Sequence, residues 1–306
     1  MNRITGIGAC VYDTLIRVPH YPEEDTKLRA WDVVSAGGGP VATGLVAAAK
    51  LGGSCAYIGA LALDSAGDYL EKDFRRYGVE TDLIERLPGS SFTSTVLLAG
   101  DSKTRTCVFD RGTVYESALS ERQLAAVRAC DVLMVDGNNL ASAVKAAEAA
   151  READVKVLYD AGGLYDGVEK LIRYADYLIP SEEFALGFTG EKSAEAAAKK
   201  LYEKYAPRAV VVTQGKNGGI FFCGSPESYP AFKVDAADTN GSGDVFHGAF
   251  AYFLSAGFSV RDCCKLSSAV SALKCTRVGS RQGAPSMAEL KSFLAERRVT
   301  VQEIPE

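Results

Sequence analysis

The chain has 306 residues, 47% of them hydrophobic and 24% charged, with a formal net charge of −5 at pH 7. These values indicate a globular protein with a large core, and the acidic balance argues against a general nucleic-acid or membrane-surface binder, which needs clustered basic charge. No uncharged run is convincing as a membrane span, and the N-terminus lacks a signal-peptide layout. The eight cysteines include no C-x-x-C pair. We therefore expect a soluble cytoplasmic protein with buried, reduced thiols.

Strands alternate with helices along most of the chain. We expect a first strand at 4–11, a helix at 41–51 that begins after Pro40, a strand at 55–61 and a helix at 64–77. Further strands are predicted at 132–136, 156–160, 177–179 and 209–213, with a hairpin through 221 and 229. Further helices are predicted at 120–129, 141–153, 165–174, 182–186, 194–205, 243–256, 260–276 and 287–296. This order predicts a three-layer α/β/α fold with a mostly parallel central sheet.

Two segments do not fit the alternation. Residues 16–34 are polar and contain prolines, and 92–98 with 104–109 form a hairpin pattern around Gly100. We expect about 14–36 and 90–112 to form a small β lid, inserted in a single domain that spans 1–306.

The most informative segment is 238–244, Asp238-Thr239-Asn240-Gly241-Ser242-Gly243-Asp244. A Gly-Ser-Gly turn that opens a helix leaves backbone N–H groups that can hold an anion. Asp244 repels such an anion, so it makes sense as a general base beside it. A well-packed helix start, with Asp244 accepting first-turn amides, would produce the same pattern. The segment alone leaves both interpretations open.

Two other glycine-rich segments precede it. Gly37-Gly38-Gly39-Pro40 comes just before the helix at 41–51, and Thr213-Gln214-Gly215-Lys216-Asn217-Gly218-Gly219 follows the strand at 209–212. Glycines at a helix start or at the carboxyl end of a parallel strand let backbone approach a ligand, although ordinary turns look alike. The chain has no P-loop sequence, and Gly6-Ile7-Gly8 does not complete a dinucleotide fingerprint.

In chain order, these segments resemble the PfkB/ribokinase family of carbohydrate kinases. The resemblance covers essentially the whole chain and is carried by Gly38-Gly39-Pro40-Val41-Ala42-Thr43, by 238–244, and by Cys275-Thr276-Arg277-Val278-Gly279 with Gly283 and Pro285. It implies ATP-dependent phosphorylation of a hydroxymethyl group on a sugar or sugar derivative, with Mg²⁺ and, in members that use it, K⁺. A nucleoside kinase of the same fold and a non-catalytic sugar- or nucleotide-sensing protein are the alternatives.

The resemblance also implies roles for individual residues. Asp244 would be the base, and the amides of Gly241, Ser242 and Gly243 would hold the transferring phosphoryl group. The sugar would be bound by Asp13, Gly38, Gly39 and Thr43, and the nucleotide by Thr213, Gly215, Gly218 and Asn240. Asp238 matches a monovalent-cation ligand. Pairing of two lids through their exposed edges would give a homodimer.

Several positions depart from the family or stay open. Thr43 stands where the family often has Asn, so one sugar contact is shortened or lost, and Asn240 replaces the usual Thr. Ser181-Glu182-Glu183-Phe184 stands where the family has N-x-x-E, so Glu182 or Glu183 substitutes as a magnesium ligand, or nucleotide and water hold the metal. The stretches 230–235 and 272–277 are most similar to the sulfofructose-kinase branch, but Asn138 stands where that branch has a sulfonate-reading Arg. Lys27 either faces an anionic group of the substrate or is a solvated lysine. His247 is expected to pack rather than to catalyse.

Overall fold

The computed structural model describes residues 2–102, 104–114 and 117–299. Within them the main sheet has nine strands in the order β15-β14-β13-β12-β11-β10-β1-β4-β6. Every neighbouring pair from β13 to β6 is parallel, and only β14 and β15 join antiparallel. The strands are β1 Arg3–Ile7, β4 Ser54–Tyr57, β6 Val79–Glu80, β10 Val132–Asp136, β11 Lys156–Ala161, β12 Tyr177–Pro180, β13 Ala209–Thr213, β14 Gly219–Phe222 and β15 Pro226–Tyr229.

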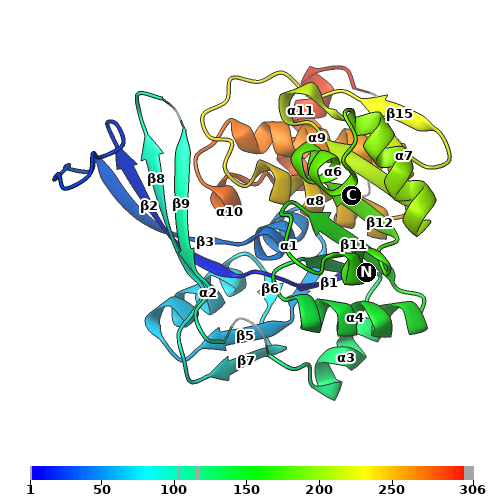
Figure 1. Ribbon diagram of the computed structural model, residues 1–306, viewed down its shortest axis with the longest axis horizontal. Coiled ribbons are helices and arrows are strands. Elements are labelled where there is room, and N and C mark those ends of the chain that lie inside the picture. The colour runs from blue at the N-terminus through cyan, green and yellow to red at the C-terminus, as the bar shows by residue number, and fades with distance from the viewer. Residues whose placement is uncertain (1, 103, 115–116, 300–306) are drawn as a thin grey trace.

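Helices cover both faces of this sheet (Figure 1), which confirms the three-layer prediction. One face packs against α1 Pro40–Lys50, α2 Ser65–Arg76, α8 Ser242–Ser255, α9 Val260–Cys275 and α11 Met287–Glu296. The other packs against α3 Glu121–Arg128, α4 Leu140–Glu152, α5 Glu169–Ile172, α6 Glu182–Thr189 and α7 Ala194–Tyr205. Along β11, Leu158 joins the first cluster while Val157 and Tyr159 join the second, as side-chain alternation in a strand requires.

A separate four-stranded sheet occupies the two segments that the sequence set apart as a lid. Its order is β3-β2-β8-β9, with β3 Asp32–Gly38, β2 Val11–Val18, β8 Thr93–Ala99 and β9 Arg105–Asp110. The predicted hairpin is confirmed, because β8 and β9 pair antiparallel from Thr93 opposite Asp110 onward. In Figure 1 this small sheet projects from the left of the body, and α10 (Ser280–Gly283) lies beside its base.

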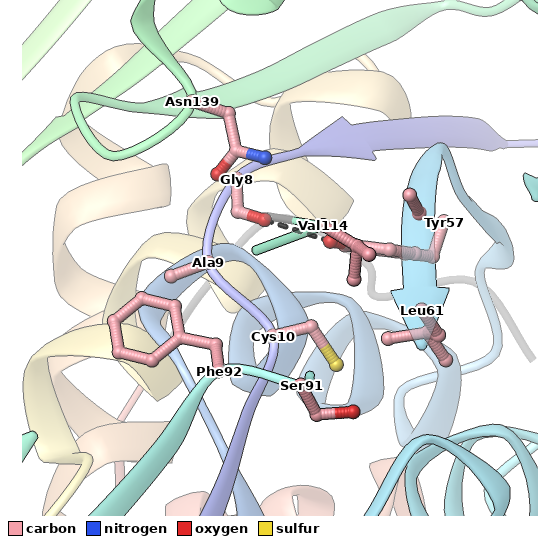
Figure 2. Close-up of a pocket in the computed structure, with 10 residues that line it drawn as sticks. Gly8, Ala9, Cys10, Tyr57, Leu61, Ser91, Phe92, Val114 and Asn139 are labelled. Carbon is pink, nitrogen blue, oxygen red and sulfur yellow. Dashed lines mark hydrogen bonds between the residues drawn. The ribbon is translucent and has the colours of Figure 1, made fainter. Parts of the chain in front are cut away.

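Two predicted strands are each divided in the structure. The strand expected at 4–11 breaks at 8–10, where the chain passes from the main sheet to the small one. A Cβ on Gly8 would lie 2.3 Å from Asp136 Oδ2, and the Tyr57 hydroxyl donates to Gly8 O at 2.8 Å (Figure 2). A cavity of about 10 Å³ at this bend has room for one water. The strand expected at 55–61 divides into β4 and β5 (Gly59–Ala62), which pairs with β7 (Ile84–Leu87).

Two other expectations were wrong. Of the helix predicted at 165–174, only Glu169–Ile172 is α-helical, because Gly167 has a φ of 80° and the chain turns there. Cys107 and Cys223 are exposed rather than buried, although all eight cysteines are free thiols. No helix among the described residues combines the length and apolar character that crossing a membrane would require.

Helices α1 and α8 touch backbone to backbone. A Cβ on Gly248 would lie 2.0 Å from Gly44 O, and a Cβ on Gly44 would lie 3.2 Å from Asp244 O. Only glycine allows this approach, and it fixes the start of α1, next to Gly38 and Gly39, relative to the start of α8.

Candidate active site

The start of α8 has the geometry of an anion-binding site, the anion seat, made of the backbone N–H groups of Gly241, Ser242 and Gly243. Gly241 precedes the helix with a φ of 73°, and a Cβ there would lie 2.4 Å from Ser280 Cβ. The first amides of a helix have no partner within it and carry the positive end of its dipole. One of the three predicted donors is partly engaged, because the Ser242 N–H donates to Thr239 O at 3.2 Å.

Asp244 lies in the first turn of the same helix. Burial, together with the negative charge of Asp160, raises the pKa of Asp244 to about 7, while His247 and Arg105 act in the opposite direction. A carboxyl group with a pKa near neutrality is suited to exchange protons with a substrate at physiological pH.

His247 and Asp160 are buried in contact with each other, and sequence reasoning did not find this contact. The His247 Nδ1 atom lies 3.2 Å from Asp160 Oδ2 and 2.7 Å from Gly243 O, and Nε2 lies 3.0 Å from Ile179 O. Burial raises the pKa of Asp160 well above its usual range. Asp136 and Asp160 lie at or next to the carboxyl ends of the parallel strands β10 and β11. Because ligands bind at that edge of a parallel sheet, this position was the sequence signal that could have marked Asp160 as a site residue.

The predicted sugar residues Asp13, Gly38 and Gly39 meet where the small sheet joins the body. Ser94 Oγ donates to Asp13 Oδ1 at 2.6 Å, and a Cβ on Gly38 would lie 2.0 Å from Asp13 Oδ2. Gly39 has a φ of 93°, and a Cβ there would lie 2.2 Å from Ala9 O. Burial raises the pKa of Asp13. Both glycines are therefore required for the backbone to lie against the carboxylate and the bend.

The remaining predicted sugar contacts are in different situations. Thr43 is fully buried one turn into α1, and its hydroxyl has no hydrogen-bond partner within the described part of the chain. Asn138 is buried, and its backbone N–H and side-chain amide both point at Asp136 Oδ1, at 2.9 and 3.3 Å. Lys27 is exposed, in the loop between β2 and β3.

A cavity of about 590 Å³ joins the predicted nucleotide turn to the anion seat. Thr213, Gly215 and Gly218 line one part of it, and Ser242 and Gly243 line another. The apolar part of its lining includes Phe232, Val234, Phe246 and Ala272. Its size and mixed lining are those of a small-molecule site that also holds an anionic tail.

Asn240 and Glu182 are held by side-chain partners near this cavity. The Asn240 side-chain oxygen accepts from the Arg105 guanidinium on β9, which links the small sheet to the 238–241 loop. Glu182 Oε1 accepts from Gln214 Nε2 at 2.7 Å, which places a carboxylate next to Thr213. Among the described residues, no group of three acidic, histidine or cysteine side chains forms a metal cage.

Arg281 on α10 is a further buried charge that the sequence analysis did not single out. Its guanidinium donates to Asp73 Oδ2 and to Gly38 O, both at 2.7 Å, and lies 4.9 Å from the centre of the Phe74 ring. It ties the C-terminal tail to the glycine segment beside Asp13. Its proximity in sequence to the tail motif was the only signal.

A nucleotide-sized cavity that ends at a helix start, with a carboxyl group of raised pKa beside it, defines a phosphotransferase-like site on an α/β fold. The sequence pattern of the pfkB family carbohydrate kinases matches residues 1–287. The chain belongs to this family and is a carbohydrate kinase.

Individual relatives agree with this assignment. The ribokinase of Haemophilus influenzae is 27% identical over 303 residues, covering 95% of this chain and 98% of the relative. The ribokinase of Lactococcus lactis is 25% identical over 304 residues, covering 98% and 100%. A solved structure of Arabidopsis thaliana ribokinase complexed with ribose and ATP has the same fold, with a TM-score of 0.87 at 23% identity and coverage of 96% and 98%.

Proposed function

We propose that the protein transfers the γ-phosphoryl group of ATP to a primary hydroxyl of a sugar or sugar derivative, with Asp244 as general base. One observation carries this proposal: a carboxyl group with a pKa of about 7 shares its helical turn with Ser242 and Gly243, which line a cavity of about 590 Å³. The nucleotide would extend from Thr213–Gly218 to the anion seat, and the sugar would lie between Asp13 and Asp244.

The phosphoryl transfer requires only the acceptor hydroxyl, ATP and the Asp244 carboxylate. The acceptor hydroxyl gives its proton to the Asp244 carboxylate as its oxygen bonds to the γ-phosphorus, and the bond from that phosphorus to the β,γ-bridging oxygen breaks to release ADP. The amides of Gly241, Ser242 and Gly243 would stabilise the charge on the equatorial oxygens. The Ser242 N–H would then turn from Thr239 O to the phosphoryl group.

The residues present fit Mg²⁺ held mainly by the nucleotide. Mg²⁺ is usually bound through one or two carboxylates together with phosphates and water, and Glu182 offers one carboxylate beside the nucleotide turn. When bound, the ion would neutralise phosphate charge during transfer.

The base assignment is tested with Asp244→Asn. We expect this variant to fold and to bind ATP with unchanged affinity, while kcat falls by roughly 10²–10⁴ because no group accepts the hydroxyl proton. Titration calorimetry with ATP and a coupled ADP-release assay measure the two properties. Turnover at the wild-type rate would refute the mechanism.

The acceptor is identified by one ADP-release screen over sugars, sugar phosphates, sugar acids, inositols and nucleosides. A preference for a nucleoside would replace the sugar in this proposal, and a preference for an anionic sugar would give Lys27 a substrate-binding role. If no acceptor in the screen leads to ADP release, the result would favour the alternative of a non-catalytic sugar- or nucleotide-sensing protein.

A further inference from the structure

Lys274, in the last turn of α9, is fully buried and faces the loop that forms the anion seat. Its side chain is 0% exposed, and its ammonium donates to Asp238 O at 2.8 Å and lies 3.6 Å from Asp238 Oδ2. A buried ammonium costs several kcal/mol unless oxygen acceptors compensate it. In the 238–241 loop a single residue, Asp238, supplies these oxygen acceptors.

Asp238 has its other acceptor positions filled by backbone donors. Its Oδ1 accepts from the Asn240 N–H and its Oδ2 from the Gly279 N–H, both at 2.8 Å. The N–H groups of Ala237 and Asp238 donate to Cys275 O at 2.8 and 3.1 Å. The loop is thus fastened to the end of α9 around the ammonium. A free monovalent cation at Asp238 would compete with Lys274 for the same oxygens.

The ammonium is also part of the electrostatics of the candidate site. Burial lowers the pKa of Lys274, while Asp238 and, more weakly, Asp244 oppose that shift. Asp238 connects the Lys274 ammonium to the backbone of the anion seat, because its carboxylate accepts from the Asn240 N–H. An ammonium is a compact single positive charge with three donors, which suits it to the oxygen ligands of a monovalent cation.

We propose that Lys274 supplies, as part of the chain, the single positive charge that a monovalent cation would supply beside the anion seat, so that the kinase does not depend on K⁺. The residues at Asp238 do not fit a bound K⁺, because an ammonium already hydrogen-bonds to the Asp238 carbonyl oxygen and lies 3.6 Å from Oδ2. This inference rests on the proposed anion seat at 241–243.

The first test compares wild-type turnover in KCl with turnover in tetramethylammonium chloride at equal ionic strength, using an acceptor from the screen above. We expect less than a twofold difference. Activation of tenfold or more by K⁺ would overturn the proposal.

The second test does not require activity and therefore separates this proposal from the proposed function. Melting temperatures of wild type and Lys274→Met are measured in both salts. Wild type should melt at the same temperature in each. The variant should melt lower than wild type in tetramethylammonium chloride and regain part of the loss in KCl, because K⁺ can then reach the freed Asp238 oxygens.

A matched control is Lys156→Met, because the Lys156 ammonium also donates to a backbone carbonyl, Leu254 O at 3.4 Å, but far from the anion seat. It should show no K⁺-specific recovery. A wild-type melting temperature that rises by several degrees in KCl overturns the proposal. So does a Lys274→Met protein that ignores K⁺, since the lysine would then have only a packing role. Lys274→Gln replaces the methionine variant if that protein does not fold.

Discussion

The two sheets of this kinase contribute unequally to the candidate site. At the carboxyl end of the main sheet, Asp136, Asp160 and His247 are buried, and Asp136 and His247 each have hydrogen-bond partners on the backbone. β9 of the small sheet is exposed along its whole length. Regions with few buried contacts open at lower free energy than cores do. We therefore expect changes on the main-sheet side to act on kcat, and changes on the small-sheet side to act on the KM for the sugar.

After Asp244→Asn, the largest effect is expected from Gly241→Ala, which places a methyl group 2.4 Å from Ser280 Cβ on a backbone with a φ of 73°. The anion seat should be distorted, and loss of one such donor typically lowers kcat roughly 10²–10³-fold. Steady-state kinetics measures it.

Gly243→Ala is the matched control, since its Cβ would meet nothing within 4 Å and its backbone is helical. It should retain kcat within about tenfold, because a small side chain leaves the amide in place. Equal losses in the two variants would contradict the assigned geometry.

On the small-sheet side, Asp13→Ala should raise the KM for the sugar by about 10–100-fold, because hydrogen bonds to a charged group contribute about 1.5–3 kcal/mol. The KM for ATP should stay within about twofold, since Asp13 does not line the nucleotide cavity. Ser94→Ala, which removes the 2.6 Å donor to Asp13, should raise the sugar KM less. A change in ATP KM alone would count against the division between the sheets.

The pH profile of kcat/KM tests the role of Asp244 on the main-sheet side, with a smaller expected effect. Asp244 must be ionised to accept a proton, so activity should fall about tenfold per pH unit below an apparent pKa of about 7. Asp160→Asn should move this limb to lower pH, because the charge of Asp160 raises the Asp244 pKa. A limb that stays in place would show that burial alone sets it.

The same raised pKa predicts a stability difference with a definite sign. The folded protein binds a proton at Asp244 that the unfolded chain releases at lower pH, so its stabilising contribution is lost as pH rises through about 7. Asp244→Asn should therefore gain melting temperature over wild type between about pH 4 and 7 and keep that gain above. Thermal melts across this range measure it.

The smallest effect on turnover is expected from charges on the exposed edge strand of the small sheet. Val108 and Phe109, on the edge strand β9, are 68% and 57% exposed. Trp31, which immediately precedes β3, is 62% exposed. If two small sheets pair in a homodimer, Val108→Glu with Phe109→Glu should halve the mass in sedimentation equilibrium. Leu63→Glu, at a 61% exposed position on the body, should leave the mass unchanged.

Local sequence signals predicted the mostly parallel sheet and most element boundaries, because strands and helices differ in hydrophobic period. They failed where one apolar run serves two sheets. Ile4–Val11 and Cys55–Leu61 each look like one strand, and only contacts distant in sequence, such as Tyr57 with Gly8, show where the chain bends. The short α5 was overpredicted because its apolar residues hide the turn at Gly167.

For the site, glycine-rich turns could be found from sequence because their backbone requirements are local. Asp160, Arg281 and Lys274 could not, because each has its role through a partner far along the chain: His247, Gly38 and Asp238. A buried charge leaves no periodic signature, and its partner is fixed only by the tertiary fold.

The contact between Gly44 and Gly248 bears on how such an enzyme could acquire a new substrate. Because α1 and α8 touch through backbone atoms, Gly44 and Gly248 constrain the separation between the glycine segment at the start of α1 and the anion seat at the start of α8. In the proposed mechanism this is the separation between acceptor and phosphoryl donor. A library that randomises the small sheet while keeping both glycines would vary the choice of acceptor and leave the transfer distance unchanged. Evolution of specificity and conservation of the reaction can therefore proceed in separate parts of one gene.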